Sequence, residues 1–390
     1  MSNNTVVREL NGVRGIAVLM VLLLHFGGRP PGVPKIFTAP FALGWSGVDL
    51  FFVLSGFLIT GILLDTRLAT NYFSSFYARR ILRIFPIYFL SVFVYFHIAL
   101  PMAHRYGHWL SFDGAPEIWY WCYLSNWLDA FGQDHCFLGH FWSLAIEEQY
   151  YFVWPVVVFV TKRSWLRYVC VATIGLSFGL RCAFQDYNQI HPGFLYSLTP
   201  FRLEPLAFGG LVAIIVRDEQ WCTRMRSHIG VVAGAALLLL AGVLLLTRNA
   251  NHDSPLMTTV GFSAFAIIYS CLVFFAYTNA GSSEWLAVQL RRPFLMSFGV
   301  YSYAIYVFHA PISGYQNAVL LRIAATVPSQ FHIFLWAASK LVGVVLSYGV
   351  ALLSWHLIEK HFLKAKRRFS ARGQPEAPSN GTSHPQLVAQ

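Results

Sequence analysis

Two ionisable residues, Arg14 and His25, interrupt the first apolar run of the chain. They are eleven residues apart, about three helical turns, so in a helix both lie on one face, roughly 16 Å apart along the axis. An imidazole can accept a proton from a hydroxyl near neutral pH, and a guanidinium binds anions. The alternative is structural, with Arg14 extending to the polar surface and His25 acting as a hydrogen-bonded core residue. The shared face favours the chemical interpretation.

Three arginines within five residues, Arg79, Arg80 and Arg83, form a second candidate site. Arg79 and Arg83 are four residues apart, so on a helix they can point in the same direction. Guanidinium groups donate forked hydrogen bonds that fit phosphate oxygens. The cluster predicts a phosphate site, and anchoring of a helix end at a membrane surface is the alternative.

A third group opens the apolar run near residue 141. Ser143, Glu147 and Tyr151 recur at every fourth residue and therefore form one stripe on a helix. Of the adjacent carboxylates Glu147 and Glu148, we expect one to be exposed and inert. Polar groups that enter an apolar helix suggest function.

Weaker signals lie at the start of two other apolar runs and inside a third. Asp49 precedes one run, where the preference of acids for helix N-termini is a sufficient explanation. Arg202 and Glu204 are an ion-pair candidate at the start of another. His309 lies within an apolar run, where a core histidine is the common case.

Composition indicates where these residues are held. The 390 residues are 56% hydrophobic and only 12% charged, against about 25% charged in soluble domains. This balance excludes a soluble domain, a disordered chain and a disulfide scaffold. The net charge of +11 does not indicate nucleic acid, because cytoplasmic loops of membrane proteins concentrate Lys and Arg.

The chain is therefore predicted to be an all-α, polytopic integral membrane protein with about ten transmembrane helices. Most Lys and Arg residues fall in alternate loops, which predicts cytoplasmic N- and C-termini and a multi-pass protein of the plasma membrane, the inner membrane of a bacterium. The first run is expected to be an uncleaved signal anchor. The expected spans lie near residues 12–28, 42–64, 83–101, 141–161, 166–184, 203–216, 229–247, 257–277, 298–320 and 333–358.

Two segments lie outside this pattern of spans. The connection at residues 102–140 is long enough to be functional, and its Cys122 and Cys136 form either a disulfide or two free thiols. Residues 1–360 are expected to form one transmembrane domain, and residues 361–390 a basic, disordered cytoplasmic tail.

With the expected spans and orientation, the arginines lie toward the cytoplasm, and the histidine and carboxylates lie in the outer half of the membrane. Such an axis suits a long donor with a polyphosphate head, and acyl-coenzyme A has that shape. His25 would then take the proton of an acceptor hydroxyl, and a neighbouring carboxylate would orient the ring.

The same residues resemble the membrane acyltransferase-3 family. The similar segments are Arg14 and His25 with ten residues between them, Gly47–Phe57, Arg79–Pro86, Trp142–Gln149, Thr199–Leu211 and Tyr301–Pro311. The resemblance runs from about residue 7 to 360. It implies transfer of an acetyl or other short acyl group from acyl-coenzyme A to a hydroxyl of a glycan or glycolipid. Some members carry a fused esterase-like domain, which we do not find in this sequence.

These considerations give each residue an expected role. The catalytic group is His25, Glu147, Asp49 and Ser143; the donor-binding group is Arg14, Arg79, Arg80 and Arg83; the acceptor-binding group is Glu148, Tyr151, Arg202 and His309. The expected partners are acyl-coenzyme A, with acetyl-coenzyme A as the expected form, a sugar or lipid-linked glycan, and the lipid bilayer, without metal or nucleic acid. A small-molecule acceptor remains an alternative. A transporter or flippase is the alternative from another class.

Overall fold

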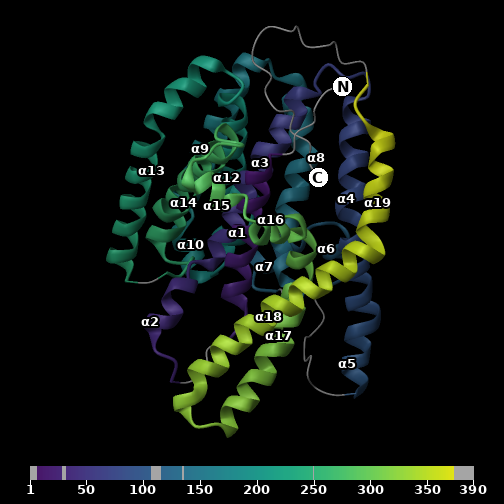
Figure 1. Ribbon diagram of the computed structural model, residues 1–390, viewed down its shortest axis with the longest axis vertical. Helices are drawn as coiled ribbons and strands as arrows, with labels where there is room; N and C mark the ends of the chain where they lie inside the picture. Colours follow the sequence, from purple (N-terminus) through teal and green to yellow (C-terminus); the bar gives the residue numbers. More distant parts are fainter. Residues whose placement is uncertain (1–6, 29–31, 107–115, 134–135, 249, 373–390) are drawn as a thin grey trace.

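The computed structural model describes residues 7–28, 32–106, 116–133, 136–248 and 250–372, and within these residues it is helical, without strands. This confirms the predicted all-α class. The longer helices form a bundle along the long axis of the molecule (Figure 1). They are α1 (Arg8–His25), α3 (Gly47–Asp65), α4 (Tyr72–Val94), α8 (Trp142–Val160), α9 (Arg163–Ala183), α12 (Thr199–Ile215), α13 (Glu219–Thr247), α14 (Phe262–Thr278), α17 (Ser302–Thr326) and α18 (His332–Ser354).

Short helices connect the long ones. They are α2 (Lys35–Thr38), α5 (Leu100–Tyr106), α6 (Ile118–Trp121), α7 (Ser125–Ala130), α10 (Gln185–Ile190), α11 (Phe194–Ser197), α15 (Trp285–Leu290), α16 (Pro293–Val300) and α19 (Lys360–Ala365). The expected functional connection at residues 102–140 contains α6 and α7 in its described part. Cys122 and Cys136 are not joined by a disulfide.

Six helices of the described chain are long and apolar enough to cross a membrane, or seven if α16 and α17, bent by 77°, count as one span. The protein is therefore a multi-pass membrane protein, and the count of about ten spans with cytoplasmic termini stays a prediction. Each of the ten expected segments lies mainly on helix, and the segment at residues 298–320 includes the bend between α16 and α17. Among the expected spans on helices outside these six, α12 has only 17 residues, and α1 carries the charged residues Arg8, Glu9 and Arg14.

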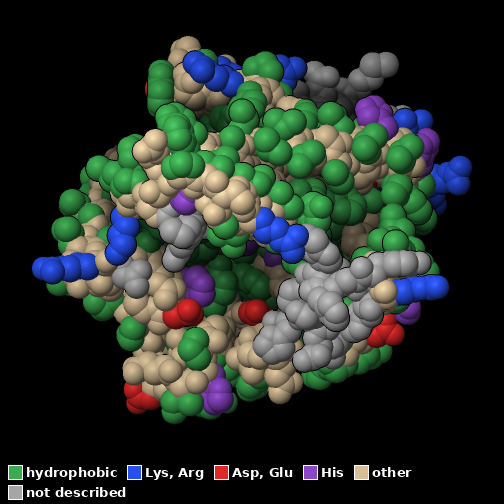
Figure 2. Space-filling model, turned by 90° about the horizontal axis from the view of Figure 1, so that it is seen from below, with side chains coloured by type: hydrophobic (Ala, Val, Ile, Leu, Met, Phe, Trp, Pro, Cys, Tyr) green, Lys and Arg blue, Asp and Glu red, His purple; other side chains and the backbone are tan. Residues whose placement is uncertain are grey.

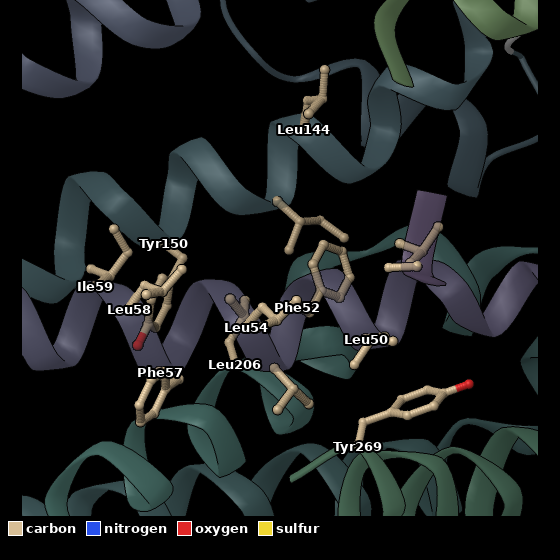
Figure 3. Close-up of a cluster of buried hydrophobic side chains, with 14 of the residues drawn as sticks. Leu50, Phe52, Leu54, Phe57, Leu58, Ile59, Leu144, Tyr150, Leu206 and Tyr269 are labelled. Carbon is tan, nitrogen blue, oxygen red and sulfur yellow. The ribbon is translucent and has the colours of Figure 1, made fainter. Parts of the chain in front are cut away.

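Helix α3 lies at the centre of the bundle and α13 at its edge (Figure 1). The apolar window that contains α3 is 78% buried, whereas that of α13 is 17% buried. Leu50, Phe52, Leu54 and Ile59 of α3 are all less than 2% exposed, and Leu54 lies near Leu206 in the close-up (Figure 3). Helix α13 instead exposes a leucine-rich surface, as expected for contact with lipid tails.

Glycines allow α3 and α12 to pack backbone to backbone. A Cβ added to Gly56 would lie 1.9 Å from the carbonyl oxygen of Leu206, and one added to Gly209 would lie 2.0 Å from that of Val53. Small residues at membrane helix interfaces permit this close approach. The α3–α12 contact fixes the position of α3, which carries one wall of the cavity described below.

We expect Gly209→Ala to lower the melting temperature in detergent, because the added methyl group overlaps the α3 backbone and overpacking costs about 1–3 kcal/mol. Gly234→Ala is the matched control, since a Cβ there meets nothing within 4 Å and α13 is peripheral. Equal melting temperatures of the two variants in a thermal-shift assay would contradict this packing.

The chain beyond α18 continues as helix. After a π-helical turn at Trp355–Glu359, α19 and the 3₁₀ turn Lys366–Phe369 pack against α4. The first residues of the expected tail are thus ordered through contacts that the sequence does not reveal. Residues 373–390 lie outside the described chain.

Candidate active site

An open cavity lies between α1, α3, α4, α8 and α17, and its empty space, with the solvent at its mouth included, is about 820 Å³. Its walls bring together polar residues that are far apart in the sequence. They are Arg14, Ser55, Arg80, Arg83, Ser143, Glu147, Glu148, Tyr151, Ser302, Tyr303 and Tyr306. Seven of the twelve candidate residues named from the sequence are therefore in one place.

The predicted stripe of Ser143, Glu147 and Tyr151 is confirmed, since all three line the cavity. The expectation that one glutamate is exposed is wrong, because Glu148 lines the same cavity and both carboxylates are half-buried. Neighbouring helix residues differ in direction by only 100°, so a cavity that curves around α8 can reach both. The Tyr151 hydroxyl is hydrogen-bonded to Ser55 of α3.

The cavity has an excess of positive charge without direct partners. In the described part of the chain, no carboxylate oxygen lies within 4.0 Å of a guanidinium nitrogen of Arg14, Arg80 or Arg83. Arg14 donates to the side-chain oxygen of Asn11 (3.2 Å), and the Arg80 guanidinium lies 5.3 Å from the centre of the Tyr151 ring. Cations inside a membrane helix bundle are costly unless they are paired. The arrangement therefore suits an anionic ligand.

Arg79 and Arg83 do not point to one place, although their spacing allows it. Arg83 lines the cavity, whereas Arg79 lines a smaller adjoining pocket of about 370 Å³ with Ser75 and Lys366. Arg80 lines both spaces. The expected arginine cluster is thus divided over two pockets that share one side chain.

Three histidines form a cluster beyond the far wall of the cavity. The ring centres of His25 and His309 are 4.9 Å apart, and those of His140 and His309 are 5.0 Å apart. Sequence reasoning missed His140. Its position three residues before Ser143 in the chain was the available signal.

Backbone carbonyls fix which nitrogen of each ring carries hydrogen. Nδ1 of His25 donates to the carbonyl of Val21 (2.8 Å), and Nδ1 of His309 donates to that of Tyr306 (2.5 Å). His140 donates through Nε2 to the carbonyl of Val307 (3.1 Å). Each neutral ring therefore keeps one nitrogen as a proton acceptor. Nε2 of His309 and Nδ1 of His140 are buried without a hydrogen-bond partner.

A hydrogen-bonded pair separates the cavity from the histidines. The hydroxyls of Ser143 and Tyr306 lie 2.5 Å apart, and both residues line the cavity, whereas His25 does not. The Tyr306 ring centre is 5.3 Å from that of His309. His25 therefore adjoins the cavity through His309 and Tyr306 and is not in its wall.

The histidine cluster lies toward one end of the molecule. His25 is the last residue of α1, and α2 follows it at the lower end of the view in Figure 1. Figure 2 shows this end to be hollowed, with histidine and acidic side chains in and around the hollow. The arginines lie nearer the opposite end, because α4 begins there.

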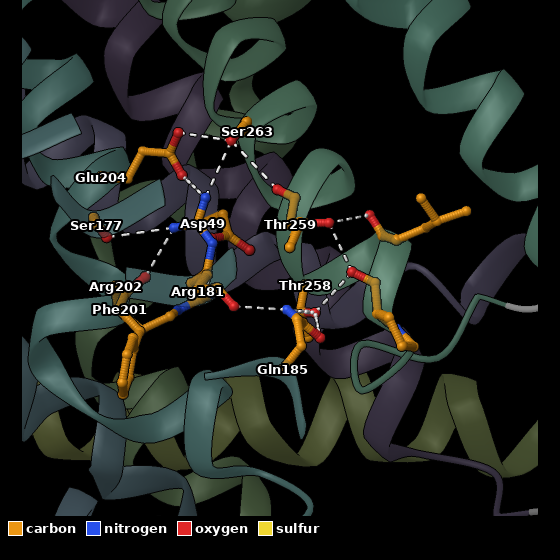
Figure 4. A network of polar contacts seen from close by, with 12 residues as sticks. Asp49, Ser177, Arg181, Gln185, Phe201, Arg202, Glu204, Thr258, Thr259 and Ser263 are labelled. Carbon is orange, nitrogen blue, oxygen red and sulfur yellow. Dashed lines mark hydrogen bonds and ion pairs between the residues drawn. The ribbon is translucent and has the colours of Figure 1, made fainter. Parts of the chain in front are cut away.

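Asp49 and Arg202 lie outside the cavity in a buried polar network (Figure 4). Nη2 of Arg202 lies 2.8 Å from Asp49, and the guanidinium is 4.5 Å from the ring centre of Phe262. Arg202 does not pair with Glu204, the candidate that the sequence offers, because Glu204 pairs with Arg181 of α9. The two ion pairs connect α3, α9 and α12.

We expect Arg202→Met to destabilise the protein strongly, because it leaves the Asp49 carboxylate buried without a cation. Removing one member of a buried pair costs about 3–5 kcal/mol. The double variant Asp49→Leu/Arg202→Met removes both charges and should recover most of the loss in melting temperature. A single variant that melts like the wild type, or a double variant no better than the single, would contradict this structural role.

The comparisons with known proteins agree with this architecture. The family described as an acyltransferase domain (Acyl_transf_3) matches residues 7–356. The chain is 26% identical over 373 residues to a Staphylococcus aureus (strain COL) protein named "Putative O-acetyltransferase SACOL0978", over 91% of this chain and 57% of the relative. It is 25% identical over 370 residues to O-acetyltransferase OatA of S. aureus (strain NCTC 8325 / PS 47), over 90% of this chain and 56% of the relative. The chain thus spans a little over half the length of these relatives, and no solved structure matches it.

Proposed function

This chain belongs to the acyltransferase-3 family (Acyl_transf_3), and from that premise we propose that it is a membrane O-acyltransferase. It moves an acetyl or other short acyl group from acyl-coenzyme A to a hydroxyl of a glycan or glycolipid. The observation that carries the proposal is the cavity itself, with unpaired arginines on one side and a histidine cluster behind the Ser143–Tyr306 pair on the other.

The donor is assigned to the arginine side. Arg14, Arg80 and Arg83 supply guanidinium groups without a carboxylate partner, and phosphate oxygens are their preferred anions. The apolar residues of the same wall, such as Leu54 and Leu58, suit the uncharged arm that carries the thioester. The phosphates would enter from the cytoplasm and the thioester would lie at Ser143 and Tyr306.

His25 is assigned as the general base. Its Nδ1 hydrogen is held by Val21, so Nε2 carries the lone pair that takes the acceptor proton. The acceptor oxygen then forms a bond to the thioester carbonyl carbon, the carbon–sulfur bond breaks, and coenzyme A leaves as the thiolate. The proton on His25 returns to that sulfur or to solvent. His309, which contacts the His25 ring, keeps it in position.

The carboxylates and hydroxyls of the wall have supporting roles in this scheme. One hydroxyl of the Ser143–Tyr306 pair would turn its hydrogen away from the backbone carbonyl of His140 and donate it to the substrate carbonyl oxygen as that oxygen gains charge. Glu147, Glu148 and Tyr151 contact the bound substrates. Asp49 and Arg202, in their own ion pair, act by positioning α3 against α12.

The acceptor is assigned to the hollowed end that Figure 2 shows. Two relatives carry the name O-acetyltransferase OatA, and a hydroxyl acceptor agrees with that name. A glycan or lipid-linked sugar outside the bacterial inner membrane would reach the histidines from this end. A small metabolite would need a route from the cytoplasm.

His25→Ala is expected to reduce acyl transfer about 10²–10⁴-fold, which is the usual contribution of a general base. Transfer of radiolabelled acetyl groups to membrane glycan by reconstituted protein measures it. The matched control is His228→Ala, since His228 is exposed on α13 and bonds within its own helix. A folded His25→Ala variant with wild-type activity would remove the proposed base.

Arg83→Gln is expected to raise KM for acyl-coenzyme A about tenfold or more and to leave KM for the acceptor nearly unchanged, because it removes a charged phosphate contact. Arg224→Gln is the control for loss of charge, since Arg224 is exposed on α13. Equal changes in both constants would point to anchoring or folding in place of donor binding.

A further inference from the structure

Lys340 of α18 is a buried lysine that the proposed mechanism does not use. The residue is 8% exposed, and in the described part of the chain no carboxylate oxygen lies within 4.0 Å of its Nζ. Lysines are almost never buried to this extent unless they are paired, because burial removes the hydration of the charged group. The contacts of Lys340 must therefore explain its position.

The partners of Lys340 are backbone carbonyls at the end of α1. Its Nζ donates to the carbonyl of Leu23 and to that of Phe26 (2.7 Å). The last carbonyls of a helix have no partner within the helix, and a lysine side chain can supply the missing hydrogen bonds. His25 lies between Leu23 and Phe26, so Lys340 holds the backbone on both sides of the proposed base.

A second side chain, Asn317 of α17, holds the carbonyl of His25 itself. Its Nδ2 donates to that oxygen (2.9 Å). Helices α17 and α18 pack side by side (Figure 1), and Gln316 Nε2 donates to Oγ of Ser339 (2.7 Å), the residue before Lys340. The end of α1 is therefore hydrogen-bonded to two helices that are also bonded to each other.

The turn after α1 provides space for the lysine. Gly27 has a φ of +95°, which favours glycine, and a Cβ at this position would lie 3.1 Å from Cγ of Lys340. The ring centres of Trp336 and Phe41 each lie 4.8 Å from Nζ, so cation–π attraction offsets part of the cost of burial. The surroundings of Lys340 thus fit a long cationic side chain directed at the end of α1.

We propose that Lys340 is a positioning residue for acyl transfer, which fixes the end of α1 so that the His25 ring stays against His309. The inference rests on the proposed function, because it takes His25 as the general base. The two ring centres are 4.9 Å apart, and His309 lies on the same helix as Asn317. The contacts of Lys340 and Asn317 therefore set where the His25 ring lies relative to α17.

A positioning role predicts a loss in the chemical step and not in binding. A general base must lie within hydrogen-bond reach of the proton that it removes, and a displacement of about 1 Å can lower the rate about 10²-fold. Lys340 does not line the donor cavity, so its removal takes no direct contact from acyl-coenzyme A. The expected effect is thus on kcat.

The test measures kcat and both KM values of Lys340→Met in the full chain reconstituted in lipid, with acetyl-coenzyme A as donor and purified membrane glycan as acceptor. We expect kcat to fall about 10- to 10²-fold and both KM values to change less than about twofold, because only the alignment of the base is lost. An unchanged kcat, or a loss that lies in KM alone, would show the positioning role to be wrong.

His332→Leu is the matched control for loss of a buried helix cap. His332 is 5% exposed and donates through Nε2 to two carbonyls at the end of α17, those of Ala324 (2.9 Å) and Val327 (3.0 Å). Its removal should lower the melting temperature and leave kcat of the folded protein unchanged. If His332→Leu lowers kcat as much as Lys340→Met does, a general loss of stability is responsible and the proposal is wrong.

A double variant tests whether Lys340 acts through His25. In a His25→Ala background, Lys340→Met should change the residual kcat less than about twofold, because the base that Lys340 positions is already absent. Independent effects would instead multiply, and that result would overturn the proposal.

The proposed function and this inference fail in different ways. If the wild type transfers no acetyl group, or if His25→Ala is fully active, the proposed function or its base is wrong and the positioning role is wrong as well. If His25→Ala loses activity and Lys340→Met does not, only the positioning role is wrong. Should Lys340→Met not fold, Asn317→Leu replaces it in each comparison, since it removes the hydrogen bond to the His25 carbonyl.

Discussion

The central constraint is the cost of keeping unpaired guanidinium groups inside a bundle of apolar helices. Elsewhere in the described chain this cost is offset by direct pairs, such as Arg202 with Asp49 and Arg181 with Glu204. Arg14, Arg80 and Arg83 lack such a pair and face an open cavity. The contrast distinguishes charges that hold helices together from charges without a carboxylate partner, and the proposed donor site is based on it.

The same contrast explains how the site is supported. The α3–α12 contact, with glycines in place of side chains, and the buried ion pairs form a rigid side of the bundle. The cavity lies on the other side of α3, where α1, α4, α8 and α17 contribute polar groups. The Ser143–Tyr306 hydrogen bond then divides the polar interior into an arginine part and a histidine part. In the proposed reaction, the donor reaches this pair from the arginine part and the acceptor reaches it from the histidine part.

The helical periodicity of the sequence correctly predicted which residues share one face of a single helix. The 3.6-residue repeat correctly grouped Ser143, Glu147 and Tyr151, and composition gave the helical membrane class. Neither periodicity nor composition predicts contacts between segments that lie far apart in the sequence. Lys366 joins the arginines only because the chain after α18 returns to α4, and Asp49 meets Arg202 across 153 residues. Arg83 faces the cavity and Arg79 does not, and this difference depends on the helices packed against α4 and not on the spacing of the two arginines.

The most direct test of a donor cavity that ends at Ser143 and Tyr306 is photolabelling with an acyl-coenzyme A whose acyl group carries a diazirine. The whole chain would be labelled in lipid nanodiscs and mapped by peptide mass spectrometry. The account predicts label on peptides that contain Ser143 or Tyr306, and loss of that label with excess acetyl-coenzyme A. Label confined to other helices, or label that acetyl-coenzyme A does not displace, would contradict it.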